Sequence, residues 1–373
     1  MECQYPDCLY AAELLEKWSA VIQSAPFAIA VVADDGRILE CSPAWESMLG
    51  FCPLGYRYQD FTHPADLVDD EQQHLALVSG EIESYCLKKR YVTAQGRWLT
   101  VLLQVAKGNE NSDSVIAFVT DISAADEKYQ SKILRDRVLK GIAAGEFELR
   151  YQPIVDLHTK RTVGVEALIR WRQSDRLLSP GDFLGNLSQE TIESLTFEVI
   201  ALALNDLDLV EPYWIAINLD PRTLEDEQFS AQLISLLRAL PCDPSAIRFE
   251  VTEQYLMNLD LVDATLRQLA EKFVVEIDDL GAVSGYSNLA LLTQPFFKGV
   301  KIDKSLTDKI YHPHEGERTR RLFRALMQLA ENLRLEAIVE GIETERQLLF
   351  LKANGFTLGQ GYYFSKPVRA EEL

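Results

Sequence analysis

The sequence predicts an α/β protein: a (β/α)8 TIM-like barrel preceded by a smaller α+β domain. Short apolar runs that carry polar groups recur at intervals of roughly thirty residues or more, and such an interval suits one strand–helix unit of the barrel. These runs are residues 163–168, 214–219, 247–253, 275–279, 299–303 and 337–341. The chain has 373 residues, which leaves room for a further domain before a barrel of about 250 residues.

Composition excludes some classes of function. Hydrophobic residues make up 47% of the chain and charged residues 25%, as in ordinary soluble globular proteins. The net charge is -20 and the pI is near 4.7, which argues against a DNA- or RNA-binding protein because such proteins need a basic surface. A small phosphodiester substrate stays possible, since bound cations reverse the local charge.

We expect a cytoplasmic protein without a membrane segment. The sequence lacks a run of roughly twenty apolar residues, and its first residues do not resemble a signal peptide. Its six cysteines form no CxxC pair and are expected to be reduced thiols.

The residues before 123 predict one helix and then a small domain. The spacing of Leu9, Leu15 and Trp18 predicts an amphipathic helix within residues 1–20. Asp34-Asp35-Gly36 predicts a hairpin turn. The pattern that follows predicts strands at 29–32, 37–41, 83–92, 97–106 and 114–120, with helices at 44–50 and 66–79.

This order of elements resembles a PAS domain, which would cover residues 21–123. The resemblance rests on residues 34–38, 63–66, 89–91 and 121–123. It implies a sensor that binds a small ligand or forms dimers, and its ligand stays unknown. His74 lies beside Gln72 and Gln73 on a predicted helix, so we expect a solvated side chain rather than a haem ligand.

A linker helix is predicted over residues 124–142. Tyr129, Ile133, Val138 and Ile142 would form one apolar stripe along it. A signalling coiled coil and a plain interdomain helix both stay open, because the stripe spans too few heptads to decide.

The barrel is expected over residues 143–373. Its first strand is predicted at 147–155, and the others are centred on Val165, Ile217, Phe249, Ile277, Ile302, Ile338 and Tyr362. Helical periodicity marks residues 190–209, 261–272 and 319–333.

Asp278 and Asp279 close one predicted strand and are the first chemical signal. A buried acidic pair needs a neutralising cation, and carboxylate oxygens suit Mg²⁺ or Mn²⁺. Taken alone, the pair fits a solvated turn equally well. The other runs would bring further polar groups to the same end of the barrel: Glu166, Asn218, Glu250, Glu253, Lys301, Asp303 and Glu340.

Several of these runs resemble the EAL-domain family over about residues 134–373. YQPIV at 151–155, EALIRW at 166–171 and QGYYF at 360–364 are similar to its most typical runs, and residues 251–253, 301–303 and 340–344 match further motifs in order. The resemblance implies a cyclic-di-GMP phosphodiesterase that opens its substrate to linear pGpG. It also implies two Mg²⁺ or Mn²⁺ ions and a homodimer formed through the barrel, to which residues 286–292 and the PAS domain would contribute.

The resemblance implies a role for each matching residue. The ligands of the first cation would be Glu166, Asn218, Glu250 and Asp278, and those of the second Asp278, Asp279 and Glu340. The catalytic groups would be Lys301, Glu340 and Asp279, with Lys301 next to the nucleophilic water. The substrate would be held by Arg170 and Gln360, the loop after Asp279 by Glu253, and the metal ligands by Asp303, Glu343 and again Gln360.

The chain departs from the family pattern after the acidic pair. Two extra residues separate Asp279 from Tyr286, Asp220 replaces a usual serine, and Gln254 follows Glu253 where serine is usual. A non-catalytic cyclic-di-GMP receptor or protein-interaction module therefore stays open as the alternative to an enzyme. The sequence has no motif of the corresponding cyclase, so we do not expect synthesis of the nucleotide.

Overall fold

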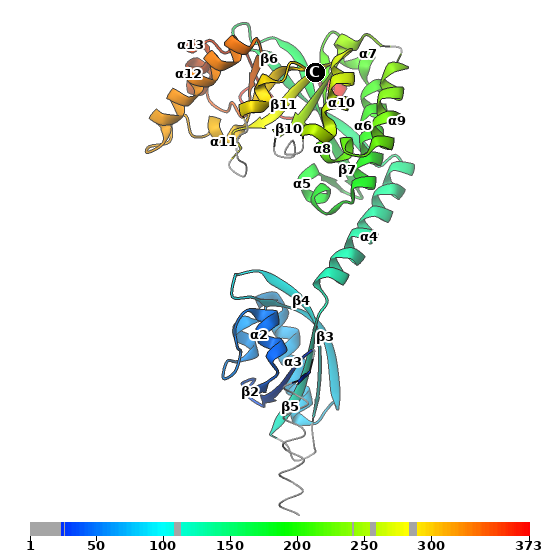
Figure 1. Cartoon of the computed structure of the whole chain (residues 1–373), viewed down its shortest axis with the longest axis vertical. Coiled ribbons are helices and arrows are strands. Elements are labelled where there is room, and N and C mark those ends of the chain that lie inside the picture. Colours follow the sequence, from blue (N-terminus) through cyan, green and yellow to red (C-terminus); the bar gives the residue numbers. More distant parts are fainter. Residues whose placement is uncertain (1–23, 26, 108–112, 241, 254–258, 283–288) are drawn as a thin grey trace, which may run out of the picture. The chain divides into compact units, whose positions relative to one another are not determined.

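The structure is a computed structural model that describes residues 24–25, 27–107, 113–240, 242–253, 259–282 and 289–373. The chain divides into two compact units, Met1–Gln130 and Ser131–Leu373 (Figure 1). The expected helix within residues 1–20 and the run 286–288 lie outside the described residues. No described helix is long and apolar enough to cross a membrane.

The first unit is a five-stranded antiparallel sheet with helices packed on it. Its strands are β1 (Ala28–Ala33), β2 (Ile38–Cys41), β3 (Ser84–Val92), β4 (Trp98–Lys107) and β5 (Ser114–Asp121), in the order β2-β1-β5-β4-β3. Its helices are α2 (Pro43–Leu49) and α3 (Leu67–Ser79), with short 3-10 turns η1 (Tyr58–Phe61) and η2 (Pro64–Asp66). These bounds confirm the strands and helices predicted for this part of the chain.

The expectation that His74 is a solvated residue is wrong. His74 is 4% exposed, its Nε2 lies 3.1 Å from the carbonyl oxygen of Asp34, and its ring packs edge-on against Tyr58. The same core holds a buried ion pair between Asp70 on α3 and Lys89 on β3. The neighbouring glutamines made the helix face look polar, but the buried face of α3 itself carries polar groups.

The second unit contains a closed eight-stranded barrel, which confirms the predicted fold class. Its strands are β6 (Phe147–Asp156), β7 (Thr162–Gln173), β9 (Trp214–Leu219), β10 (Ile247–Thr252), β11 (Val274–Leu280), β12 (Phe297–Ile302), β13 (Glu336–Val339) and β14 (Leu358–Gly359). The ring closes because β6 pairs with both β14 and β7, and β8 (Arg176–Leu178) extends β7 as a hairpin.

Two features of the barrel differ from the expected repeat. The first strand, β6, is antiparallel to both neighbours, because a tight hairpin rather than a helix joins it to β7. The last strand ends at Gly359, and Tyr362, expected at its centre, lies in a turn with 58% of its surface exposed. From β7 through β14 the barrel strands run parallel, so their C-terminal ends meet at one rim.

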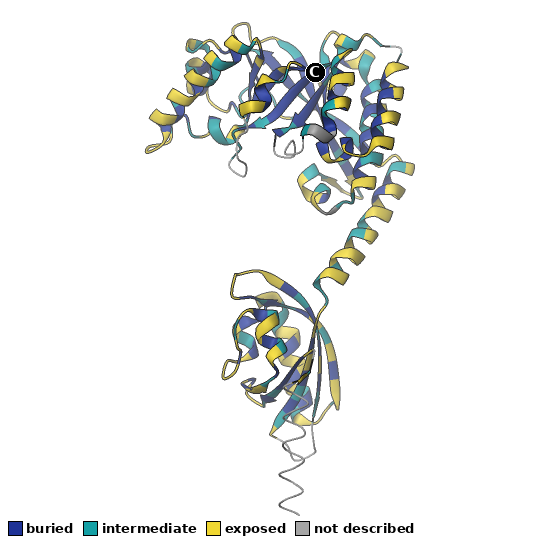
Figure 2. Ribbon diagram, in the orientation of Figure 1, coloured by how far each residue is buried: buried dark blue, intermediate teal, exposed yellow. Residues whose placement is uncertain are grey.

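Helices surround the barrel, and the burial colouring shows its strands as the most deeply covered elements (Figure 2). The longer helices are α4 (Ser123–Ala143), α6 (Gln189–Asn205), α9 (Glu227–Arg238), α10 (Leu259–Ala270), α12 (Gly316–Leu333) and α13 (Glu345–Ala353). The short ones are α5 (Pro180–Phe183), α7 (Leu207–Val210), α8 (Pro221–Leu224), α11 (Lys304–Thr307) and the 3-10 turns η3 (Leu184–Asn186), η4 (Pro244–Ala246), η6 (Leu289–Thr293) and η7 (Ala370–Glu372). They confirm the predicted helical stretches.

The linker helix α4 has two kinds of apolar residue. Leu134, Val138 and Ile142 pack against the hydrophobic core of the barrel unit. Tyr129 and Ile133 are 61% and 38% exposed. The predicted single stripe is therefore divided: its C-terminal half packs against the core of the barrel unit, and Tyr129 and Ile133 in its N-terminal half are exposed.

Candidate metal centre

Four barrel strands bring charged side chains into the interior near their C-terminal ends. Glu166 comes from β7, Glu250 from β10, Asp278 from β11 and Lys301 from β12, and all four are buried. Side chains alternate along a strand, so Glu166, Glu250 and Lys301 each lie between two apolar neighbours, whereas Asp278 follows Ile277 and precedes Asp279. The alternation explains why carboxylates occur inside otherwise apolar runs.

The ammonium group of Lys301 lies at the centre of this cluster. It is fully buried, and its Nζ lies 2.7 Å from Glu340 Oε1, 2.9 Å from Glu250 Oε2, 3.1 Å from Glu166 Oε2 and 3.4 Å from Asp278 Oδ1. Although burial favours the neutral amine, the four surrounding carboxylates raise the pKa of Lys301 well above its usual value. Lys301 is therefore a cation that holds four carboxylates together.

Two amide side chains orient the same carboxylates. Asn218 Nδ2 donates to Glu166 Oε1 over 2.9 Å. Gln360 Nε2 donates to Glu166 Oε2 over 2.7 Å and to Glu340 Oε1 over 2.8 Å. Gln360 is 4% exposed, so the structure places it against the carboxylates rather than at an open surface. These donors hold Glu166 and Glu340 in position.

The carboxylates carry more negative charge than Lys301 neutralises. Burial raises the pKa of Glu250 and of Asp278, and it raises that of Glu340 to about 8. Glu166 differs: the charge of Lys301 and the donors of Gln360 and Asn218 outweigh its burial and lower its pKa. A site in which several carboxylates are driven toward protonation is one in which a divalent cation would take the place of the protons.

Asp279 lies beside Asp278 in an unusual backbone conformation. Its φ is 60°, and its backbone N–H donates to Asp278 Oδ1 over 2.9 Å. The pairing of β11 with β12 is irregular between Ile277 and Leu280, which turns the Asp279 side chain out of the regular alternation. Burial, with the nearby charges of Asp278 and Asp303, raises the pKa of Asp279 to about 6.

Two overlapping groups of carboxylates are suited to metal binding. Glu166, Glu250 and Asp278 offer oxygen atoms within 4.8 Å of one another, and so do Asp278, Asp279 and Glu340. Asp278 belongs to both groups. Glu250 Oε1 is buried and has no hydrogen-bond partner among the described residues, as expected of an oxygen placed for an ion. This set of hard oxygen donors fits two neighbouring Mg²⁺ or Mn²⁺ ions.

The remaining predicted residues surround this centre. Arg170 is half-buried on β7, and its Nη1 donates to the carbonyl oxygen of Ile169 over 2.9 Å. Burial lowers the pKa of Arg170, and the nearby charge of Glu166 acts in the opposite direction. Asp303 caps α11 by accepting from Ser305 N over 3.0 Å. Glu343 forms an ion pair with Lys304 at the surface. Glu253 is 8% exposed, and Gln254 beside it lies outside the described residues.

A cavity of about 420 Å³ adjoins the centre at Asn218. Its wall is mostly apolar and includes Leu168, Leu184, Ile192, Leu195 and Val199. Its polar side includes Asp220, which caps α8 by accepting from Arg222 N over 3.0 Å. An apolar cavity with a few polar groups is typical of a site for a small organic ligand.

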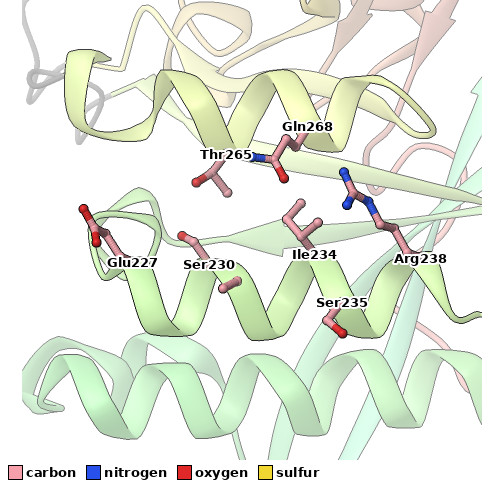
Figure 3. Close-up of a pocket in the computed structure, with 8 residues that line it drawn as sticks. Glu227, Ser230, Ile234, Ser235, Arg238, Thr265 and Gln268 are labelled. Carbon is pink, nitrogen blue, oxygen red and sulfur yellow. The ribbon is translucent and has the colours of Figure 1, made fainter.

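A second hollow, of about 440 Å³, lies between α9 and α10 on the outside of the barrel (Figure 3). Glu227, Ser230, Arg238, Thr265 and Gln268 line it, and none of the predicted site residues does. The candidate metal-binding carboxylates therefore lie at the barrel rim and not in this hollow.

Two charged residues inside the barrel were not predicted as part of the site. Arg248 and Glu276 each precede a candidate ligand by two residues, and the Glu276 side chain is fully buried. The alternation that identified Glu250 and Asp278 also applies to them. That alternation is the sequence signal by which Arg248 and Glu276 could have been predicted to face the barrel interior.

Comparison with known proteins finds relatives that match the barrel unit, which contains the candidate metal centre. A model of the EAL domain matches residues 135–367, and a model of the PAS domain matches residues 16–80. A Pseudomonas aeruginosa protein named a cyclic di-GMP phosphodiesterase is 32% identical over 236 residues, which cover 61% of this chain and 39% of the relative. An Escherichia coli protein named a probable cyclic di-GMP phosphodiesterase is 31% identical over 244 residues, covering 63% and 46%.

A solved structure shows the same likeness. The Klebsiella pneumoniae BlrP1 structure, a calcium and cyclic-diGMP complex, is 28% identical with a TM-score of 0.51, and the match covers 60% of this chain and 56% of that one. The chain spans less than half the length of the two relatives above. The family match covers more than half of the chain, which therefore belongs to the EAL domain family and carries a PAS domain before its barrel.

Proposed function

We propose that this chain hydrolyses cyclic-di-GMP to linear pGpG with two divalent cations bound at the candidate metal centre. The observation that supports this most is the pair of carboxylate groups that share Asp278. Two divalent cations at such a site stabilise the charge that develops on the phosphodiester oxygens and make a water molecule a better nucleophile.

Each residue contributes a separate function in this proposal. Glu166, Asn218, Glu250 and Asp278 would hold one cation, and Asp278, Asp279 and Glu340 the other. Lys301 pairs with Glu250 and Glu340, and it would present its positive charge to the reacting phosphate. Arg170 would bind a phosphate oxygen, because its planar fork suits that geometry. We assign the cavity beside Asn218 to a nucleobase.

Gln360 fits better as an orienting group than as a substrate contact. Its Nε2 is already bound to Glu166 and Glu340, and the residue is buried. Asp303 would act near Asp279 as a capping residue, Glu343 through its ion pair with Lys304, and Glu253 at the segment that follows β10. We further propose that residues 21–123 regulate the barrel through the helix at 124–142, and that the chain forms a cytoplasmic homodimer.

The proposal is tested by incubating the purified chain with Mg²⁺ or Mn²⁺ and cyclic-di-GMP and separating the products. We expect pGpG to form. Glu166→Ala should abolish turnover, because it removes an oxygen shared by the cation, Lys301 and Gln360. Glu317→Ala is the matched control: this exposed residue pairs with Arg321 on α12 and should leave turnover unchanged.

The alternative is a receptor that binds cyclic-di-GMP without hydrolysing it. The two extra residues between Asp279 and Tyr286 favour this alternative, because they follow a candidate ligand directly. Binding of the nucleotide without product would support the receptor. Unchanged turnover in Glu166→Ala would contradict the metal assignment itself.

A further inference from the structure

A second charged cluster lies toward the N-terminal ends of the barrel strands, beneath the candidate metal centre, and reaches from buried Glu276 to exposed Glu336. We call it the floor cluster; it consists of Trp214, Arg248, Glu276 and Glu336. Arg248 precedes Glu250 by two residues on β10, and Glu276 precedes Asp278 by two on β11. Residues two apart on a strand share a face, so both side chains face the interior as the candidate ligands do.

Arg248 binds the other three members of the cluster. Its Nη1 donates to Glu276 Oε1 over 2.7 Å and also to Glu336 Oε2, and its guanidinium carbon lies 3.8 Å from the centre of the Trp214 ring. The Arg248 side chain is 16% exposed, and a guanidinium stacked on an aromatic ring and bound to two carboxylates is held in one orientation. Arg248 is thus a fixed cation on the barrel floor.

Glu276 depends on this cation. Its side chain has no exposed surface; Oε1 is bound to Arg248, and Oε2 has no hydrogen-bond partner in the part of the chain that the structure describes. A Cβ at Gly299 would lie 2.7 Å from Glu276 Oε1, so the carboxylate lies directly over Gly299 on β12. The absence of a side chain at Gly299 makes room for it.

The same position brings Glu276 close to the metal centre. Glu276 is the direct neighbour of Glu250 across β10 and β11, and Gly299 precedes Lys301 by two residues, roughly 7 Å along the strand. The charges of both Arg248 and Lys301 act on Glu276. Without Arg248, a buried carboxylate would remain unpaired, and Lys301 would be the cation above it. An unpaired buried charge is strongly unfavourable, so the carboxylate would attract that ammonium group.

We propose that Arg248 is a positioning residue: by holding Glu276 on the barrel floor, it prevents this further buried carboxylate from competing for Lys301. The Lys301 ammonium group then stays with Glu166, Glu250, Asp278 and Glu340. The consequence for turnover rests on the proposed function, whereas the consequence for the position of Lys301 does not.

The test compares three variants of the full chain: Arg248→Met, Arg248→Met/Glu276→Gln and, as the matched control, Arg238→Met, an exposed residue of α9 that lines the hollow beside α10 (Figure 3). Crystal structures without added cations report the position of Lys301. In Arg248→Met we expect its Nζ to approach Glu276 to ion-pair distance and to move away from Glu166, now 3.1 Å away. In the double variant the competing charge is gone, so Lys301 should return.

Turnover supplies a second measurement. We expect kcat to fall by about 10- to 100-fold in Arg248→Met with little change in KM, as is usual when a residue that supports metal ligands is lost. The double variant should recover kcat, and Arg238→Met should match the wild type. A loss of stability alone would lower the folded fraction, so kcat is compared per folded molecule.

Several outcomes would overturn the inference. One is an Arg248→Met protein whose Lys301 keeps all four carboxylate contacts. Another is a double variant in which Lys301 stays displaced. If Arg248→Met does not fold, the double variant must fold with Lys301 in its wild-type position, and failure of that variant also overturns the inference. A wild-type chain without hydrolysis would contradict the proposed function but leave the structural comparison valid.

Discussion

Gln360 shows how one residue can orient several carboxylates of the candidate metal centre. Its amide nitrogen Nε2 donates to Glu166, which belongs to one of the two carboxylate groups, and to Glu340, which belongs to the other. Replacing it with leucine keeps the volume but leaves two buried carboxylate oxygens without this donor. The expected result is a loss of cation affinity of about 10- to 100-fold.

Calorimetric titration with Mn²⁺ measures this loss directly. Gln328→Leu on α12 is the matched control, because Gln328 is exposed and its amide donates to Glu331 on the same helix. Equal Mn²⁺ affinity in Gln360→Leu and the wild type would show that Gln360 does not orient the ligands.

Lys89 gives the PAS unit a pH-dependent stability. It is 2% exposed, and burial lowers its pKa from 10.5 to about 8 even though Asp70 pairs with it. Between pH 8 and 10.5 the unfolded chain keeps the proton that the folded one has lost, so this residue makes the free energy of unfolding rise with pH. The total contribution is on the order of 3 kcal/mol.

The measurement is the thermal stability of the PAS unit in the full chain between pH 7 and pH 10.5. A Lys89→Met/Asp70→Leu variant lacks the titrating group, so the difference between the two proteins isolates it. We expect the wild type to gain stability relative to the variant as the pH rises through this window. Parallel curves would contradict the assignment.

The carboxylates that the structure brings together at the candidate metal centre could be singled out in the sequence because they carry both an alternation and a family motif. Glu166, Glu250 and Asp278 stand out as carboxylates among apolar residues. Arg248 and Glu276 obey the same alternation, but their importance depends on a neighbour that is remote in sequence, Gly299. The positive φ of Asp279 likewise depends on strand pairing, which no local pattern reveals.

At the scale of elements, the packing of β7 against β9 depends on one glycine. A Cβ at Gly164 would lie 2.1 Å from Cε2 of Trp214, so the indole ring occupies the space that any other residue would need. Gly164→Ala should destabilise the barrel by about 1–3 kcal/mol, because the ring must move within a packed interior.

Chemical denaturation followed by tryptophan fluorescence measures this change. Gly181→Ala at the start of α5 is the control, since nothing lies within 4 Å of a Cβ there. A Gly164→Ala protein as stable as this control would show that Trp214 can be displaced at little cost.

The hairpin between β6 and β7 is a connection that the sequence patterns did not predict. Its turn uses Lys160 at a φ of 58°, and Asp156 Oδ1 accepts from Thr159 N over 2.6 Å. Five residues, 157–161, join the two strands, whereas the strongest sequence signals for a hairpin, Asn-Gly and Asp-Gly, belong to two-residue turns. The strands themselves were predicted, but their antiparallel pairing required a turn signal that the sequence does not carry.

At the scale of the whole molecule, the two units have separate hydrophobic clusters among the residues that the structure describes, and no cluster includes residues of both units. The cluster of the PAS unit is built around Trp45, Phe61 and Tyr91, and the barrel unit holds one large cluster and a small one formed by Ile154, Ile338 and Leu358. This division was predictable, because the spacing of strands and turns changes near residue 123. The sequence did not predict that only the C-terminal part of the apolar stripe on α4 is buried, because the same spacing of apolar residues occurs whether they face a core or solvent.

Separate cores predict separate unfolding transitions. Differential scanning calorimetry of the full chain should resolve two, because each unit buries its own apolar residues. Lys89→Met leaves Asp70 unpaired in the PAS core and should lower the temperature of one transition only. Gly164→Ala acts inside the barrel and should lower only the other. A single transition that both substitutions shift equally would mean that the two units unfold cooperatively, and would contradict their independence.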